Sequence, residues 1–283
     1  MKAEHFSIGL GDYMAAICER PHNESKYGDL TQFLMSKLVK GVNLIGACPK
    51  MGSSTLAVSL AVELAKSGSQ VLYCAHPYQE ITGIIYRYLS KDLKHGYPLE
   101  PKCRADTNRM SDAFCAAKEI PLKTAPIFNN TTIDELETLL LEEDNIRNTY
   151  IFIDSLEDIS IDGKLCGHLT PGEYICSKIR DLSFIFQIPI IVVADLKFPT
   201  GKSESEDSDI LEIGDFRSGE LSAYANQIYL LYRPAYYYKH SVGITNRVNE
   251  DYKIVRACGG VEGLNGIFTS NERYKIDHPY QNL

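Results

Sequence analysis

The sequence predicts an α/β domain with a mainly parallel central sheet and helices on both faces. Three observations lead to this prediction. Short runs of β-branched and apolar residues alternate with stretches of helical periodicity along most of the 283 residues. The first five of these runs are almost continuously apolar, as expected of strands that are buried on both faces. The first run then leads through a glycine-containing loop, Ala47–Ser54, directly into a long helix.

The expected strands follow from their composition. The five nearly continuous apolar runs are Val42–Gly46, Gln70–Cys74, Ala125–Phe128, Tyr150–Ile153 and Pro189–Ala194. Three later runs predict a β-rich end, for which an antiparallel arrangement is one option; they are Gln227–Tyr232, Tyr252–Ala257 and Gly266–Thr269. Helical periodicity predicts helices over Ser54–Ser67, Gln79–Ser90, Thr132–Asp144 and Gly172–Phe186, with a shorter amphipathic segment at Leu30–Leu38. Thr132 and Glu135 have the spacing of a helix capping box.

Length and composition favour one large domain. A chain of 283 residues with 44% hydrophobic content can bury a sizeable core without a metal or a disulfide. We expect an N-terminal arm over residues 1–27 and a single domain over residues 28–283. The sequence has no apolar run of about 18 residues, and its N-terminus lacks the basic start and apolar stretch of a signal peptide. We therefore expect a cytoplasmic protein with no membrane partner.

Cysteine spacing and net charge argue against a zinc site and against a broad basic face for DNA, although a local basic patch remains possible. The eight cysteines form no C-x-x-C pair and no Cys/His cluster at metal-ligand spacing, which favours reduced thiols over a zinc site. The formal net charge of −8 argues against a broad basic face for DNA. Part of this acidity lies in Ser203–Asp209, which predicts a solvated loop. The tyrosines at Tyr236–Tyr238 could stack on bases, but a packing role is the favoured reading.

The loop Ala47–Ser54 has the spacing of the phosphate-binding motif G-x-x-x-x-G-K-[ST]. Gly52 lets the backbone approach phosphate closely, and the amides at the start of the following helix point toward an anion. Ser54 stands where the magnesium-binding hydroxyl belongs, but Ser53 replaces the lysine, whose charge-assisted hydrogen bonds contribute about 1.5–3 kcal/mol each. The expected nucleotide-binding residues are Ala47, Pro49, Lys50, Gly52, Ser53 and Ser54.

Two alternatives remain open for this loop. Lys50 could swing over and supply the missing charge, or the loop could be a strand–turn–helix corner that binds nothing. Asp154, at the end of the run Tyr150–Ile153, could bind magnesium directly or through water. The expected cofactors are ATP or ADP with Mg²⁺, none of them required for folding. His76 also follows a strand, but a hydrogen-bonded histidine is favoured there over a catalytic one.

These motifs, in this order, resemble the C-terminal RecA-like motor domain of DnaB-type replicative DNA helicases. The loop keeps the Ala, Pro, Met and Gly of the family's A-R-P-[SG]-M-G-K-[ST]. Ile151–Glu157 resembles the family's I-V-I-D-Y-L-Q, and Asp215–Glu220 with Tyr224–Arg233 resembles its D-L-R-E-S-G segment and the strand that follows. The resemblance covers roughly Gly28 to Thr269 and does not include the family's N-terminal collar domain. It implies Arg217 as a contact for single-stranded DNA.

Four departures from the family's motifs fall on positions that carry its chemistry. Ser53 replaces the lysine, and Pro77 replaces the glutamate of S-L-E-M that is thought to activate water. Asp195 replaces the glutamine of the S-Q-L sensor, and Cys258 replaces the arginine finger of K-Q-R-N-G. Such a finger contributes a factor of about 10³–10⁵ in related systems. Glu80 is a weak substitute for the lost base and is more typical of a first-turn charge.

The leading hypothesis is a DnaB-like protein with an eroded ATPase site that binds rather than hydrolyses. The partners expected from the resemblance are single-stranded DNA, replication proteins, a true helicase, or further copies of the chain in a ring. A role in DNA replication or in a mobile element follows from these. One alternative is an active helicase with a rearranged site built from Lys50, Asp154 and Glu80. The other is an α/β scaffold that binds no nucleotide.

Overall fold

A computed structural model provides the architecture of the chain. It describes the backbone of residues 4–5, 31, 34–49, 52–76, 111–112, 115–128, 130–143, 145–163, 169–197, 213–232, 251–257, 267–269 and 274–275. Every structural statement below concerns these residues. The expected helix over Gln79–Ser90 and the segments Ser203–Asp209 and Tyr236–Tyr238 lie outside them.

The core of the fold is a sheet with six parallel strands in its middle. In spatial order these strands are β4 (Leu122–Pro126), β3 (Gln70–Ala75), β6 (Thr149–Asp154), β8 (Pro189–Asp195), β2 (Gly41–Ala47) and β9 (Gln227–Tyr232). Antiparallel strands extend both edges: β1 (Glu4–His5) pairs with β4, and β10 (Asp251–Ala257) pairs with β9 and carries β11 (Ile267–Thr269) and β12 (Tyr274–Lys275). A separate two-stranded sheet joins β5 (Thr131–Thr132) to β7 (Ile159–Ser160).

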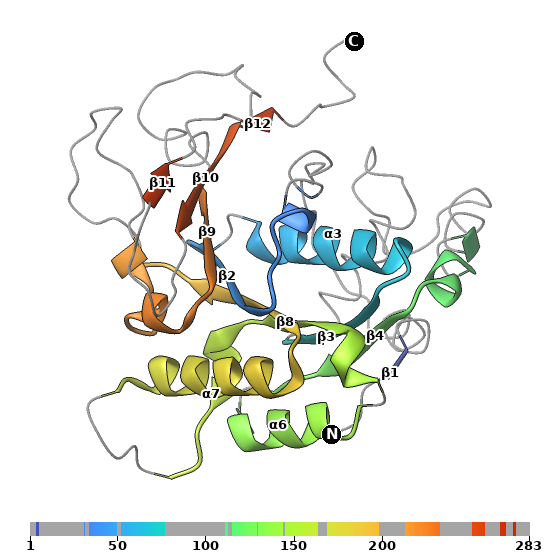
Figure 1. Ribbon diagram of the computed structural model, residues 1–283, viewed down its shortest axis with the longest axis horizontal. Coiled ribbons are helices and arrows are strands. Elements are labelled where there is room, and N and C mark those ends of the chain that lie inside the picture. The colour runs from blue at the N-terminus through green and yellow to red at the C-terminus, as the bar shows by residue number, and fades with distance from the viewer. Residues whose placement is uncertain are drawn as a thin grey trace, which may run out of the picture.

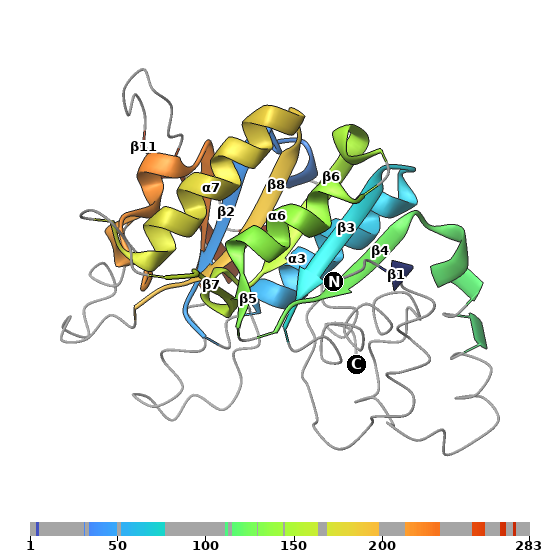
Figure 2. The same cartoon turned by 90° about the horizontal axis from the view of Figure 1, so that it is seen from below.

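Helices cover both faces of the sheet. Figure 1 shows α3 (Ser53–Lys66) on one face and α6 (Ile133–Leu141) with α7 (Pro171–Phe186) on the other. The view in Figure 2, turned by 90°, shows α6 and α7 in front of the sheet, with their axes running roughly along the strands. Four short 3₁₀ turns connect these elements: Ile146–Asn148, Leu156–Asp158, Ile213–Asp215 and Leu221–Tyr224. The architecture is therefore a three-layer α/β domain.

The parallel strands are apolar on both sides because both sides are covered. Within β2, β3 and β8 nearly every residue is buried, and the largest fully buried side chains include Tyr73, Phe152 and Phe216. The ring of Tyr73 stacks on that of Phe152, with 5.3 Å between the ring centroids. This packing fixes neighbouring strands β3 and β6 against each other under α3.

The structure confirms the predicted α/β fold and most of its elements, with three differences. The third predicted strand, Ala125–Phe128, corresponds to β4, which occupies Leu122–Pro126. The strand starts earlier because the polar Lys123 is accommodated by an ion pair with Glu143, and it ends earlier because Phe128 lies outside the sheet with 57% exposure. The strand Gln227–Tyr232 has the predicted bounds but runs parallel to β2, so the antiparallel end begins one strand later. The short strand β1 lies within the segment that was expected to be an arm.

Both helices on the lower face begin with a capping box. Thr132 caps α6: its side chain accepts a hydrogen bond from Glu135 N, and the Glu135 carboxylate accepts one from Thr132 N, as the sequence predicts. Thr170 caps α7 in the same way with Glu173, and Pro171 occupies the first helical position. The residues Thr170-Pro-Gly-Glu173 have the spacing of this second capping box. The sequence prediction instead placed the start of the helix at Gly172.

Replacing Thr132 with alanine removes the acceptor for the α6 amide and opens the capping box. We expect the free energy of unfolding to fall by about 1–2 kcal/mol in urea denaturation. Thr138→Ala is the matched control, because Thr138 is exposed in the middle of the same helix and its hydroxyl only donates back to Asp134 O at 2.9 Å. That control is expected to change stability by less than about 0.5 kcal/mol. Equal losses for the two variants would contradict the assignment of the cap.

Candidate phosphate and metal site

The carboxyl ends of the parallel strands form one edge of the sheet, and polar residues gather there. Strand β2 ends at Ala47, β6 at Asp154 and β8 at Asp195. Ala47 and Asp195 are direct partners in the ladder between β2 and β8, and the backbone amide of Leu196 donates to Ala47 O at 2.9 Å. Crevices at this edge are where open α/β sheets bind their ligands.

Helix α3 begins at the same edge. Gly52 has φ +91°, a left-handed conformation that favours glycine, and its carbonyl accepts the first helical bond from Leu56 N at 2.9 Å. The first turn of α3 contains no acidic residue, so the positive end of the helix dipole faces the loop without a built-in carboxylate. Within the predicted loop, Lys50 and Met51 lie outside the described residues. Position 53 is the first residue of α3 and carries a serine.

Three side chains connect α3 to the ends of β3 and β6. The Ser54 hydroxyl donates to Asp154 Oδ1 at 3.2 Å, and the Tyr73 hydroxyl donates to Asp154 Oδ2 at 2.8 Å. Both Tyr73 and Asp154 are buried. The Ser54 and Asp154 oxygens suit Mg²⁺, which prefers oxygen ligands and places neighbouring ones about 3 Å apart in its octahedral shell. The predicted pair of magnesium-binding residues is thus brought together in space.

Burial dominates the electrostatics of Asp154. It raises the pKa of the carboxyl group to about 6, although the hydrogen bonds from Tyr73 and Ser54 act in the opposite direction. The nearby carboxylates of Asp158 and Asp195 raise the pKa further. Burial and the Asp154 carboxylate also raise the pKa of Tyr73 well above its usual range, so this hydroxyl stays a donor. The site therefore has a negative local field that favours a bound cation.

The raised pKa of Asp154 predicts a pH dependence of stability. Between about pH 4 and pH 6 the folded chain keeps a proton that the unfolded chain has released, because a free Asp has a pKa of about 3.9. The stability that this proton contributes is present below about pH 4 and is lost as the pH rises through the folded pKa of about 6.

An Asp154→Asn variant isolates this effect, because its amide does not titrate. Its free energy of unfolding relative to the unmodified chain is expected to improve by about 3 kcal/mol between pH 4 and pH 7.5, measured by urea denaturation across the range. A difference that stays constant with pH would contradict the raised pKa. Any fixed cost of the substitution cancels in this comparison.

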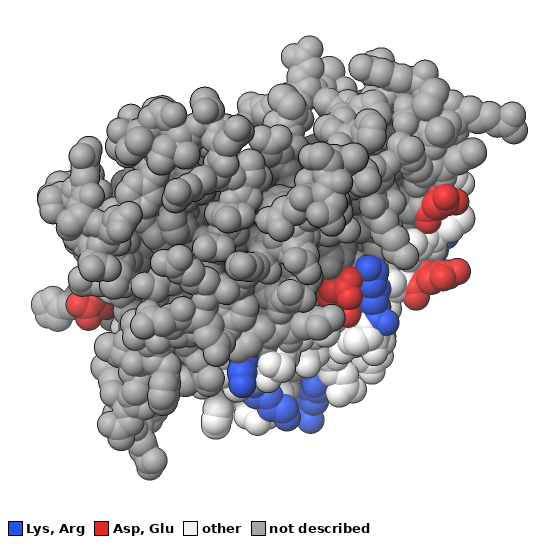
Figure 3. Space-filling view, turned by 90° about the horizontal axis from the view of Figure 1, so that it is seen from above, with Lys and Arg blue, Asp and Glu red and all other residues white. Residues whose placement is uncertain are grey.

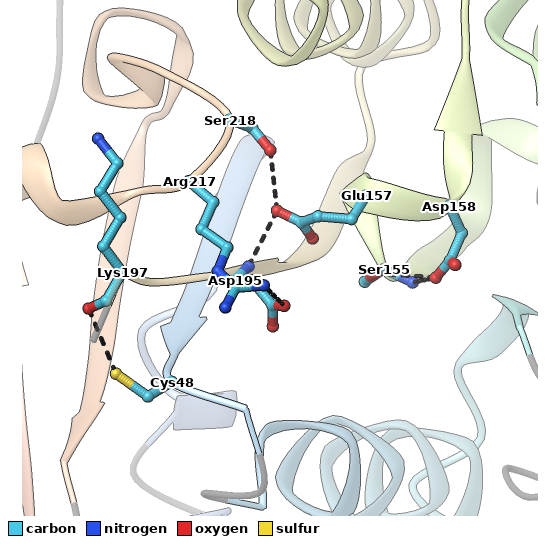
Figure 4. Close-up of polar contacts among 8 residues, drawn as sticks. All are labelled: Cys48, Ser155, Glu157, Asp158, Asp195, Lys197, Arg217 and Ser218. Atoms are coloured by element: carbon cyan, nitrogen blue, oxygen red, sulfur yellow. Dashed lines mark hydrogen bonds and ion pairs between the residues drawn. The ribbon is translucent and has the colours of Figure 1, made fainter.

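A second polar cluster lies at the end of β8 (Figure 4). The Glu157 carboxylate accepts hydrogen bonds from Ser218 Oγ at 2.9 Å and from Asp195 N at 3.1 Å. Arg217 points toward Asp195 in the close-up, and its guanidinium lies 3.5 Å from Asp195 Oδ2. Burial raises the pKa of Glu157 and that of Asp195, and the charge of Arg217 partly offsets the shift at Asp195. Asp195, which stands in place of the family's sensor glutamine, is therefore paired with an arginine.

The segment Arg217–Glu220 is hydrogen-bonded to the start of α7. The Thr170 hydroxyl donates to Ser218 O at 2.6 Å, and Glu220 N donates to Glu173 Oε1 at 2.8 Å. Gly219 has φ +116°, and a Cβ there would come within 2.4 Å of Thr170 Oγ1. Glycine is required on both counts, by its backbone conformation and by its close approach to α7. These hydrogen bonds to α7 hold Arg217 beside the end of β8.

The predicted site residues divide into three groups. The structure brings together the loop start Ala47, the turn Gly52 and the pair Ser54 and Asp154. Pro49 and Ser53 lie on the same loop and helix start, while Arg217 lies at the neighbouring cluster. Lys50, Pro77, Glu80 and Cys258 fall outside the described residues. His76 Nδ1 lies 3.1 Å from Ile127 O, as favoured for a hydrogen-bonded histidine.

Two residues of these polar clusters, Tyr73 and Glu157, were not among the predicted site residues. Tyr73 sits in an apolar strand, where nothing in the sequence separates it from core aromatics. Glu157 is part of the Ile151–Glu157 motif, but its partner Ser218 is 61 positions away. The contact of Tyr73 with Asp154 depends on the register between β3 and β6. The contact of Glu157 with Ser218 depends on the position of α7, which binds the Ser218 segment.

The described surface carries charges of both signs. Figure 3 shows one face, on which a few described Lys and Arg side chains at the lower edge lie near Asp and Glu side chains. Among the described residues, no group of three or more His, Cys, Asp or Glu side chains is placed to hold a metal ion. Within the same part of the chain, no helix is both long and apolar enough to cross a membrane. Among the described cysteines, Cys48, Cys74, Cys115 and Cys176 form no disulfide bond.

Comparison with known proteins finds likeness in structure but not in sequence. No protein-family model matches the chain, and a search of curated proteins gives no match either. A solved ATPase domain superimposes with a TM-score of 0.63 and 14% identity over 92% of this chain and 91% of its own. A DnaB-like replicative helicase, solved in a study of its interactions with primase, gives a TM-score of 0.62 and 15% identity over 89% of this chain.

The fold is that of a DnaB-like helicase ATPase domain. This agrees with the resemblance that the loop, the Asp154 strand and the Asp215–Glu220 segment indicate. The chain spans 64% of the length of the DnaB-like helicase chain. At 14–15% identity the likeness concerns the fold, and function has to be argued from the site itself.

Proposed function

We propose that this chain is a DnaB-like protein that binds a magnesium–nucleotide complex, ATP or ADP, at the loop Ala47–Ser54 and does not turn it over. The observation that carries the proposal is the 3.2 Å contact between Ser54 Oγ and Asp154 Oδ1 beside the start of α3. It joins two magnesium-type ligands to a helix N-terminus suited to phosphate.

Binding rests on backbone amides and a metal rather than on a side-chain cation. Ser53 at the start of α3 offers a hydroxyl where the motif has an ammonium. The carboxylates of Asp154, Asp158 and Asp195 make the surroundings negative, and Arg217 is engaged with Asp195. A triphosphate without a metal is poorly matched to such a site. We therefore infer that nucleotide binding depends on Mg²⁺.

Loss of hydrolysis is inferred from the altered chemistry of the motifs. Proline at position 77 has no group that can act as a base for water, and Cys258 offers no positive charge for the transition state. Asp195 replaces the neutral sensor and is paired with Arg217 instead of facing phosphate with an amide. The altered positions remove the groups that would accelerate the reaction, while Ser54 and Asp154 remain in contact beside the start of α3.

The biological role that fits is a binding or regulatory one near DNA replication, in a host or a mobile element. The support is the DnaB-like fold together with the Asp215–Glu220 segment, which α7 holds in a fixed position. Suitable partners are replication proteins, an active helicase or other copies of this chain in a ring. Arg217, whose side chain is 50% exposed, remains the proposed contact for single-stranded DNA.

Restoring the lysine tests the binding site. A Ser53→Lys variant is expected to bind ATP in Mg²⁺ at least about tenfold more tightly, because it adds a charge-assisted hydrogen bond to phosphate, measured by isothermal titration calorimetry. Ser67→Lys is the matched control, since it adds the same charge at the opposite, exposed end of α3. Its affinity should equal that of the unmodified chain.

Steady-state phosphate release, with and without single-stranded DNA, tests the loss of turnover. The unmodified chain is expected to stay below about 0.1 s⁻¹, against ordinary enzyme rates of about 1–10³ s⁻¹. Faster turnover would contradict the proposal in favour of an active ATPase. Absence of any nucleotide binding, in the unmodified chain and in Ser53→Lys alike, would favour a scaffold instead.

A further inference from the structure

The hydroxyl of Tyr73 contacts Oδ2 of Asp154, the proposed metal ligand. Tyr73 lies in β3 two residues before the strand ends, and β3 pairs in parallel with β6 so that Tyr73 is opposite Phe152 and Ala75 is opposite Asp154. Its ring stacks on Phe152 with an interplanar angle of 8°. From there the hydroxyl extends diagonally across the two strands and donates to Asp154 Oδ2 at 2.8 Å.

The two carboxylate oxygens of Asp154 have different hydrogen-bond partners. Oδ2 is engaged by Tyr73 beneath the site, whereas Oδ1 faces the Ser54 hydroxyl at 3.2 Å. Both Tyr73 and Phe152 are at most 1% exposed, so the tyrosine ring cannot move without disturbing the core. The carboxylate plane is therefore held by a rigid donor.

We propose that Tyr73 is a positioning residue for the divalent cation of this site: it holds Asp154 so that Oδ1 alone is presented beside Ser54. This inference rests on the proposed binding of a magnesium nucleotide. A rigid partner that holds a metal-binding carboxylate in place raises the affinity for the metal, because less orientational freedom is lost on binding. The residue acts through Asp154 and does not touch nucleotide itself.

An ordinary core aromatic would have a different consequence. A phenylalanine at position 73 could keep the stacking on Phe152 and the same strand pairing. What it would lose is the one donor that fixes Oδ2. A positioning role therefore predicts that the variant needs more Mg²⁺ to bind nucleotide but binds it equally well once Mg²⁺ is saturating. A role in core packing alone predicts no such change in the Mg²⁺ requirement.

The test is a Tyr73→Phe variant, with ATP affinity measured by calorimetry at a series of Mg²⁺ concentrations. We expect the Mg²⁺ midpoint of binding to rise roughly tenfold, while the affinity at saturating Mg²⁺ returns to the level of the unmodified chain. Tyr229→Phe is the matched control: Tyr229 is equally buried, and its hydroxyl donates to Lys37 O at 3.3 Å and to Gln227, on β9. Its Mg²⁺ midpoint should not move.

A double variant tests whether Tyr73 acts through Asp154. If Tyr73 served only core packing, its effect would not depend on the residue at position 154. In an Asp154→Ala background the tyrosine hydroxyl has no side-chain acceptor at position 154, so Tyr73→Phe should cause no further shift of the Mg²⁺ midpoint. An unchanged midpoint in Tyr73→Phe alone, or a loss of affinity that is equal at all Mg²⁺ concentrations, would overturn the inference and leave the proposed function standing. Failure of the unmodified chain to bind ATP at any Mg²⁺ concentration would overturn both.

Discussion

The parallel register of β2, β8 and β6 is the constraint on which the site depends. Because these strands run in the same direction and are paired in register, they deliver Ala47, Asp195 and Asp154 to one edge of the sheet. Helix α3 starts at that edge, so Ser54 meets Asp154. A slip of β6 by one residue would turn Asp154 to the opposite face, away from α3. The buried apolar faces of the strands thus determine where the polar chemistry lies.

The fold was largely predictable because the central strands are buried on both faces and leave a strong apolar signal. The bounds of Gln227–Tyr232 match the prediction, but composition does not state the direction in which a strand runs, and β9 proved parallel to β2. The two-residue strand β1 is too short to show any periodicity. Lys123 interrupts the apolar pattern of β4, and its ion pair with Glu143 depends on the fold.

The site was predictable only where chemistry and spacing coincide within a few residues. Gly52 and Ser54 follow from a local motif, and Asp154 follows from its place at the end of an apolar strand. The role of Tyr73 depends on the register between β3 and β6 and on a diagonal contact across them. Likewise the pairing of Asp195 with Arg217 depends on the bridge between Leu196 and Phe216, which brings the chain back beside the end of β8. Such contacts require the folded chain.

The central claim is that the edge beside α3 holds a magnesium nucleotide despite the missing lysine. A crystal structure determined with a non-hydrolysable ATP analogue and Mg²⁺ tests it most directly. The account predicts phosphate oxygens on the main-chain amides at the start of α3, at Gly52 and Ser53, and a metal between Ser54 Oγ and Asp154 Oδ1. Phosphates bound elsewhere, or a metal that does not contact Asp154, would contradict it.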